Sequence, residues 1–213
     1  MKLQTVMVGV GLLAISLSAS PAHATSLLWT NGPVVDPDAG GRCDQGPTGC
    51  GGSGTWTFYD NFTLATGAEV TGFSYTDWLV LGGPADYVQT NWSIFAGDPF
   101  LNSPLASGAS VAVLNPTVPD QFEFVVTGLS VNLAAGGYWL GINNTVTPGV
   151  FTTVAEVAPL DGAKQSDGAS FNFDDQPDRA FDVYGNPVPE PGTIVLLGLG
   201  LTGLSAYRRR RSR

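Results

Sequence analysis

The chain has 213 residues, 43% of them hydrophobic, and a formal net charge of −9 at pH 7. Residues 25–187 alone hold 17 acidic residues against three basic ones, a net charge of −14, which excludes nucleic acid and anionic lipid surfaces as partners of that region. These 163 residues suffice for one domain with a sizeable core.

The first 24 residues have the layout of a secretory signal peptide. Lys2 gives a positive start, Val6–Leu17 forms an apolar core, and Ala22 and Ala24 define a small-x-small cleavage site. We therefore predict cleavage after Ala24, export of the chain, and a single domain over residues 25–187.

A glycine-rich loop early in this domain holds both cysteines of the chain. Cys43 and Cys50 have six residues between them, and in an exported protein such a pair is most simply a disulfide. A metal site built on two cysteines would normally recruit histidine, and residues 25–187 contain none. We predict a disulfide between Cys43 and Cys50 and no cofactor here.

Strand-length segments recur through the domain, and no segment suits a helix. No stretch of it runs more than 12 residues without Gly or Pro, whereas globular helices average about 10–14 residues. Short β-branched and aromatic runs between turn residues indicate an all-β, antiparallel two-sheet sandwich of jelly-roll type. The predicted strands are Ser26–Trp29, Thr55–Leu64, Glu69–Thr76, Trp92–Phe95, Ala109–Leu114, Gln121–Leu129, Tyr138–Asn143, Val150–Val157 and Ala180–Tyr184.

Aromatic side chains on an outer face of such a sandwich would provide stacking surfaces for sugar rings, because exposed apolar surface often marks a binding site. Most tryptophans of a small domain belong to its core, so one or two at most would be free. The candidates for glycan stacking are Trp56, Trp78, Trp92 and Trp139.

Acidic residues gather just before the last predicted strand. Asp174, Asp175 and Asp178, with Asn172, offer the oxygen ligands that Ca²⁺ prefers, and Asp36 and Asp38 follow the first strand. The three aspartates form a candidate calcium site. Solvated turns are the alternative, since Asp favours turn positions.

The segment 188–213 combines three features in order. Pro189, Glu190 and Pro191 precede an apolar run, and the run ends at four arginines, Arg208, Arg209, Arg210 and Arg211. As a helix, the 15 residues 193–207 would span about 22 Å, short of the roughly 30 Å hydrocarbon core of a bilayer. This length favours transient insertion, and the arginines would keep the tail end cytoplasmic.

This layout resembles the PEP-CTERM sorting signal of Gram-negative bacteria, with Pro189-Glu190-Pro191 as the signature. The resemblance implies a precursor in the inner membrane, cleavage by a membrane protease called an exosortase, and release to the cell surface or extracellular matrix. An ordinary C-terminal anchor is the alternative. Residues 55–184 also look like the β-sandwich ectodomains common among proteins with this tail, at stretches such as Trp92–Phe95 and Tyr138–Ile142; that likeness implies a fold and no activity.

Catalysis has little support in the composition. His23 is the only histidine and leaves with the signal peptide, which excludes histidine-dependent hydrolysis and zinc bound by imidazole. We expect no enzyme, but a surface or matrix protein with a structural or adhesive role and exopolysaccharide as a candidate partner. The alternative is a secreted polysaccharide-acting enzyme that uses a carboxylate pair.

Overall fold

The computed structural model describes residues 26–34, 43–45, 56–147, 151–154, 157, 162–168 and 172–188, without the side chains of 43–45, 151, 153, 154 and 175. These residues form thirteen strands and one short 3₁₀ helix. The elements are β1 Ser26–Thr30, β2 Cys43–Gln45, β3 Thr57–Leu64, β4 Ala68–Val80, η1 Pro84–Asp86, β5 Tyr87–Phe95, β6 Ala106–Ser110, β7 Val113–Val118, β8 Gln121–Leu133, β9 Gly136–Val146, β10 Phe151–Val154, β11 Ala163–Ser166, β12 Asn172–Gln176 and β13 Phe181–Pro187.

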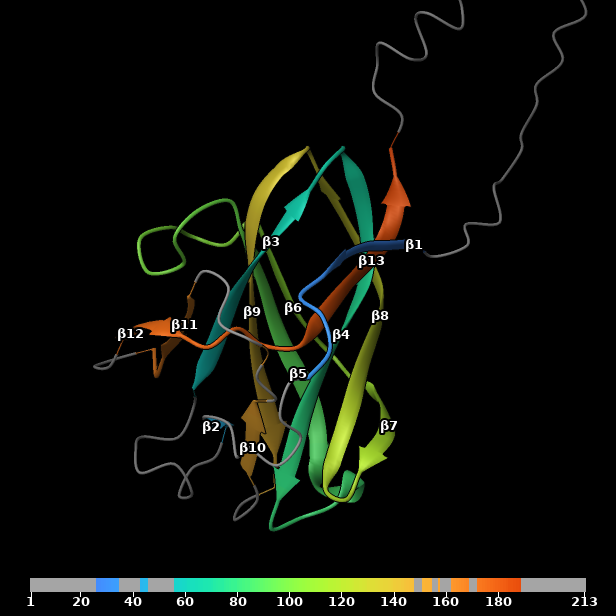
Figure 1. The fold of residues 1–213 in the computed structure, drawn as a ribbon, viewed down its shortest axis with the longest axis vertical. Helices are drawn as coiled ribbons and strands as arrows, with labels where there is room; N and C mark the ends of the chain where they lie inside the picture. The colour runs from blue at the N-terminus through green and yellow to red at the C-terminus, as the bar shows by residue number, and fades with distance from the viewer. Residues whose placement is uncertain are drawn as a thin grey trace, which may run out of the picture.

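The strands form two antiparallel sheets packed face to face (Figure 1). One is six-stranded, in the order β12-β11-β3-β9-β5-β6. The other is seven-stranded and follows β1-β13-β4-β10-β2, while β8 pairs with β4 and β7. The predicted all-β, two-sheet sandwich is therefore confirmed; the finer assignment to the jelly-roll type stays a prediction. No helix within the described ranges is long and apolar enough to cross a bilayer.

Alternating side chains build the core between the sheets. Strand β3 buries every second residue from Phe58 to Leu64, and β4 buries Phe73, Tyr75 and Leu79 against it. This period of two is what a strand with one buried face requires. The largest fully buried apolar side chains are Tyr75, Phe58, Phe62, Phe73, Phe124, Leu79, Ile94, Ile142, Val70 and Val126.

Two glycines let neighbouring strands approach closely at β-bulges. A Cβ atom at Gly72 would collide with the carbonyl oxygen of Val126 on β8, and one at Gly185 would collide with that of Glu69 on β4. The strand register shifts beside both glycines. A bulge increases the local twist, so these positions let the long strand β4 follow β8 and β13 along its length.

A buried ionic cluster joins the two sheets inside this core. Both Asp77 carboxylate oxygens accept hydrogen bonds from Arg179 Nη2 at 3.2 Å, and the Arg179 guanidinium lies about 5 Å from the rings of Phe58 and Tyr75. Asp77 is 0% exposed and Arg179 1% exposed. Removing one partner of such a pair would leave an uncompensated buried charge, so the cluster fixes how the sheets meet.

Asp60 on β3 lies beside this cluster and is also buried. Its Oδ2 accepts hydrogen bonds from Asn31 Nδ2 at 3.0 Å and from the Arg179 backbone N–H at 2.6 Å. Burial, and then the charge of Asp178, raise the pKa of Asp60 to about 8, against the opposing effect of hydrogen bonds from the Arg179 and Asn61 backbone N–H groups. The carboxyl group is therefore largely protonated at neutral pH.

Candidate binding surfaces

The four candidate tryptophans occupy four different environments. Trp56 precedes β3, is 8% exposed and lies 5.7 Å from the ring of Phe173. Trp92 packs partly buried against the core, and its Nε1 donates to Ser110 Oγ at 3.2 Å. Trp78 and Trp139 are partly exposed, and each lies between two buried residues of its strand, so each faces outward. Trp78 belongs to the seven-stranded sheet and Trp139 to the six-stranded sheet, so they lie on opposite outer faces of the sandwich.

On the outer face of the six-stranded sheet, Trp139 belongs to an aromatic group. It is paired in register with Phe95 on β5. The Tyr59 ring makes edge-on contacts with Phe95 at 5.7 Å and with Phe100 at 5.9 Å. We call Tyr59, Phe95, Phe100 and Trp139 the aromatic platform.

A glycine makes room for this platform. Tyr59 is paired across the strands with Gly141, and Gly141 with Ser93. A Cβ atom at Gly141 would lie 2.8 Å from the Tyr59 ring and 2.5 Å from Ser93 Oγ. The ring therefore lies across the backbone of β9 instead of standing away from the sheet, which gives the platform a flat base.

Lys164 on β11 borders the platform at one edge. Its Nζ donates to Asp98 Oδ2 at 2.9 Å and to Asp174 Oδ1 at 2.6 Å, and lies 4.9 Å from the centre of the Phe100 ring and 5.7 Å from that of Trp139. Partial desolvation opposes its charge, but the bonds to both carboxylates prevail and raise the pKa of Lys164. The lysine thus ties the loop between β5 and β6, which carries Asp98 and Phe100, to the sheet.

Next to the platform, amide side chains form a hydrogen-bonded ladder across β5 and β9. Gln89 Nε2 donates to Asn91 Oδ1 at 2.9 Å. Asn91 Nδ2 in turn donates to Asn143 Oδ1 at 3.1 Å and to Thr145 Oγ1 at 3.0 Å. Asn143 Nδ2 donates to the Trp56 carbonyl at 2.6 Å. We call Gln89, Asn91, Asn143 and Thr145 the amide ladder. All four are partly exposed.

The residues of the platform and the ladder are themselves uncharged, and the Lys164 ammonium, paired with Asp98 and Asp174, lies over two of the rings. The partly exposed rings of Tyr59, Phe100 and Trp139 offer flat apolar area, while Phe95 is 5% exposed. Primary amides offer both a donor and an acceptor. That combination suits ligands with apolar faces and many hydroxyl groups. Of these residues, only Trp139 was predicted from the sequence. In β3, Thr57, Tyr59, Asn61 and Thr63 alternate with buried residues, and this pattern could have indicated Tyr59.

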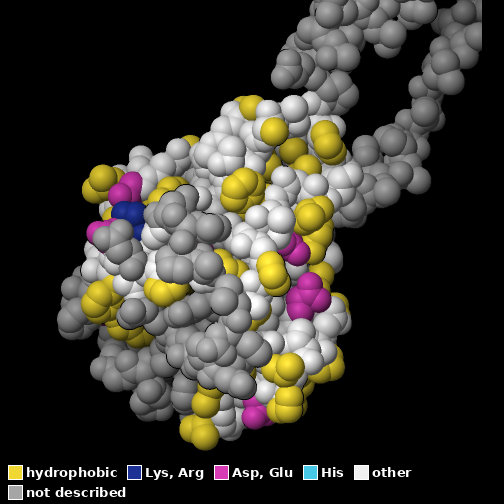
Figure 2. Space-filling view, in the orientation of Figure 1, with side chains coloured by type: hydrophobic (Ala, Val, Ile, Leu, Met, Phe, Trp, Pro, Cys, Tyr) yellow, Lys and Arg dark blue, Asp and Glu magenta, His cyan; other side chains and the backbone are white. Residues whose placement is uncertain are grey.

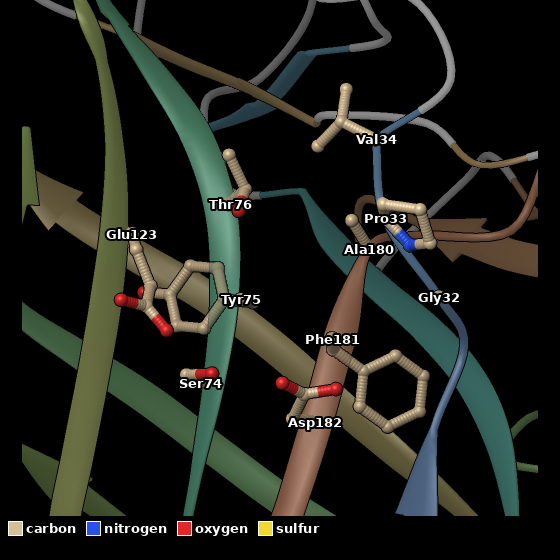
Figure 3. Close-up of a pocket in the computed structure, with 10 residues that line it drawn as sticks. All are labelled: Gly32, Pro33, Val34, Ser74, Tyr75, Thr76, Glu123, Ala180, Phe181 and Asp182. Carbon is tan, nitrogen blue, oxygen red and sulfur yellow. The ribbon is translucent and has the colours of Figure 1, made fainter. Parts of the chain in front are cut away.

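A small pocket lies on the opposite outer face, on the seven-stranded sheet (Figure 3). Ser74 and Thr76 of β4 form its floor, with Glu123 of β8 and Asp182 of β13 on either side. Its volume is about 160 Å³, below the roughly 300–1,000 Å³ usual for small-molecule sites. The other lining residues are Gly32, Pro33, Val34, Tyr75, Ala180 and Phe181.

Hydrogen bonds connect the pocket to Tyr184 on β13. The Tyr184 hydroxyl donates to Asp182 Oδ2 at 3.1 Å and lies 3.2 Å from Ser74 Oγ. Partial burial raises the pKa of Tyr184, and the nearby carboxylates of Asp182 and Glu123 raise it to a smaller extent. The phenol therefore stays neutral at physiological pH and can donate to a carboxylate.

The aspartates of the candidate calcium site lie in separate surroundings. Asp174 is exposed and paired with Lys164, while Asp178 is 1% exposed and close enough to Asp60 to raise its pKa. The Asp175 side chain, Asp36 and Asp38 fall outside the described residues. Within the described part of the chain, no group of three His, Cys, Asp or Glu side chains is placed to hold a metal ion.

Several other predicted sites also fall outside the described residues: the cleavage site at Ala22 and Ala24, Cys50 with the side chain of Cys43, the signature Pro189-Glu190-Pro191, and Arg208–Arg211. The disulfide and the signal peptide stay predictions.

Comparison with protein families identifies the tail. Residues 187–211 match the PEP-CTERM protein-sorting motif, which is the motif predicted from the three-part layout. No curated protein matches the chain. Proteins with this motif are exported and sorted to the cell surface, and the motif implies processing by an exosortase. The chain thus carries an exosortase sorting signal on a β-sandwich.

Proposed function

We propose that this chain is a surface or matrix protein whose sandwich binds a neutral polysaccharide through the aromatic platform and the amide ladder. The observation that carries the proposal is that Tyr59 and Trp139 share one outer face with hydrogen-bonded amides. Rings of this kind cover the apolar faces of sugars, and the amides replace the water that sugar hydroxyls lose.

Charge selects among polysaccharides. The region 25–187 carries a net charge of −14, so it repels polyanions. Lys164, the basic side chain beside the platform, is already paired with Asp98 and Asp174. A neutral or cationic polysaccharide is therefore the expected ligand, and calcium bridging would be needed to bring in an acidic one.

The sorting signal supplies the location for this binding. We propose removal of residues 1–24 at the predicted signal-peptide site, temporary insertion of the apolar run 193–207, cleavage near Pro189–Gly192, and release of the sandwich outside the cell. Intact-mass analysis of protein recovered outside the cell tests this route. Recovery with Arg208–Arg211 still attached would contradict it.

A glycan array with the domain 25–187 tests the binding. We expect retention on neutral polysaccharides and none on acidic ones, unchanged by a chelator. Binding to acidic polysaccharides that the chelator abolishes would instead support a calcium-dependent adhesin and the site predicted at Asp174, Asp175 and Asp178.

The alternative, a polysaccharide-acting enzyme, has support in the pocket of Figure 3. Glu123 and Asp182 lie on opposite sides of its floor, and glycosidases use two carboxylates about 5–10 Å apart. We favour the binding protein because the pocket is small and lies on the face without the aromatic platform. Release of reducing sugar that is lost in Glu123→Gln or Asp182→Asn would establish the enzyme.

A further inference from the structure

The chain enters and leaves the sandwich at one end. Strands β1 and β13 are antiparallel neighbours, with Ser26 opposite Gly185. The last residue of β13, Pro187, is opposite Ala68, the first residue of β4. The Val188 N–H donates to the Gly67 carbonyl at 2.8 Å, which fixes the exit point beside the turn between β3 and β4 (Figure 1).

The sorting signal follows this exit almost directly. Four residues, 189–192, separate Val188 from Thr193, where the apolar run begins. An extended chain reaches at most about 3.6 Å per residue, so Val188 lies within about 18 Å of the start of that run. The headgroup layer on one side of the bilayer is roughly 5–7 Å thick, so crossing it takes up that part of the 18 Å.

The end of the sandwich beside this exit is uncharged in the described residues. We call it the exit end; it consists of residues 26–28, 63–68, 132–137 and 185–188, which include no Asp, Glu, Lys or Arg. Leu27 and Val188 are exposed there. The nearest carboxylate along these strands is Glu69, on the outer face, where it accepts a hydrogen bond from Ser130. In Figure 2 the visible surface at this end is hydrophobic or otherwise uncharged.

We propose that the exit end rests on the lipid headgroup layer while the precursor waits for cleavage. This inference depends on the proposed insertion of the tail and adds a defined orientation of the sandwich. The domain as a whole has no attraction for anionic lipid, but its tether is too short to keep it away. Carboxylates held within a Debye length of about 8–10 Å of anionic headgroups would be repelled. The exit end itself carries none, and Glu69, the next residue of β4, is the carboxylate of these strands that comes within that range.

The orientation also places the candidate binding face. Strand β4 has 13 residues, so at about 3.3 Å per residue the opposite end of the sandwich lies roughly 40 Å from the membrane. The outer face of the six-stranded sheet then stands upright beside the membrane, where its aromatic platform is open to polymer outside the cell before release.

Fluorescence quenching of the full precursor in vesicles tests the orientation. Thr66 at the exit end and Val118 at the opposite end, both exposed, are replaced one at a time by a fluorescent noncanonical residue. The vesicles contain phosphatidylethanolamine and phosphatidylglycerol with nitroxide-labelled headgroups. We expect the label at 66 to lose most of its fluorescence and the label at 118 to keep it.

Flotation of the same vesicles separates two failures. If the protein floats but both labels are quenched equally, the orientation is wrong while the tail insertion stands. If the protein does not float, the insertion fails, and the orientation with it. Quenching at 66 that requires added exosortase would mean that the exit end docks on the protease and not on lipid, which also overturns the proposal.

Adding negative charge provides a matched control. Glutamate at two exposed turn positions of the exit end, Thr66→Glu with Ala135→Glu, should weaken the quenching of a label at Gly137 on anionic vesicles and restore it in high salt. The same two added charges at the opposite end, Val118→Glu with Pro119→Glu, should leave it unchanged. Equal effects of the two pairs would contradict the proposal.

Discussion

The two outer faces of the sandwich share one backbone geometry and differ in chemistry. The face of the six-stranded sheet carries rings and amides, with its ionic groups confined to the Lys164 edge. The face of the seven-stranded sheet carries Glu123 and Asp182 around a small polar pocket. In a strand the inward residues fill the core and the outward ones do not, so the two outer faces can differ in chemistry while the fold stays the same.

The largest expected effect concerns the interior that both faces share. Burial raises the pKa of Asp60 to about 8, above its unfolded value of about 3.9. The folded state then holds one more proton than the unfolded state between these values, so the free energy of unfolding falls as pH rises, by at most about 1.4 kcal/mol per unit. Urea unfolding should show this decline between pH 5 and 7.5.

Asp60→Asn should remove that decline, because its side chain does not titrate. Asp86→Asn is a control of opposite sign. Hydrogen bonds from the Gly83 N–H and then from the Thr147 hydroxyl lower the pKa of Asp86. Its contribution to the free energy of unfolding is therefore present above the unfolded pKa and is lost as pH falls. An Asp60→Asn variant as pH-sensitive as the parent would show that another group is responsible.

The second prediction compares the tryptophans on the two faces. Trp139→Ala should weaken binding of a neutral polysaccharide by about tenfold or more, as expected when a central aromatic contact is removed. Trp78→Ala removes the same indole ring from the outer face of the seven-stranded sheet and should leave the affinity unchanged. Isothermal titration measures both, with circular dichroism to confirm folding; a loss in Trp78→Ala alone would move the site to the seven-stranded sheet.

A smaller effect is expected from disturbing the platform without removing a ring. Gly141→Ala would push against Tyr59 and Ser93 and should reduce affinity several-fold. At Gly137, on the same strand, a Cβ atom would meet nothing within 4 Å, so Gly137→Ala should bind like the parent. Equal affinity of the two variants would mean that the Tyr59 ring plays no part.

The smallest effect is expected at the edge of the platform. Lys164→Gln removes the ion pairs with Asp98 and Asp174, and exposed pairs of this kind contribute about 0–1 kcal/mol. Added salt screens these pairs, so it should lower the thermal midpoint of the parent relative to that of the variant. A salt response of the variant equal to that of the parent would show that these pairs do not stabilise the loop.

The fold followed from the sequence wherever alternation was regular, as at Thr57–Leu64 and Gln121–Leu129. The predicted strand Glu69–Thr76 is too short, because β4 continues to Val80 through Asp77, which is buried against Arg179. The predicted strand Ala109–Leu114 spans a break, since the chain changes sheets at residues 111–112 between β6 and β7. Strands β11 and β12 were missed because their residues, AKQS and NFDDQ, lack the apolar alternation of a core strand.

The candidate site was only partly predictable. A tryptophan at position 139 could be proposed from composition, but its neighbours Tyr59, Phe100 and Lys164 come from three other parts of the chain and meet only through strand pairing. The amide ladder depends on the register of β5 against β9, which no local pattern specifies. The sorting motif, by contrast, is a contiguous signal, and the sequence alone sufficed to find it.

One measurement tests the binding face most directly. The domain 25–187 contains five tryptophans, whose indole N–H signals can be followed separately by NMR during titration with a neutral oligosaccharide that the array identifies. We predict that the Trp139 signal shifts and that the signals of Trp29, Trp56, Trp78 and Trp92 do not. A shift at Trp78 with none at Trp139 would contradict it.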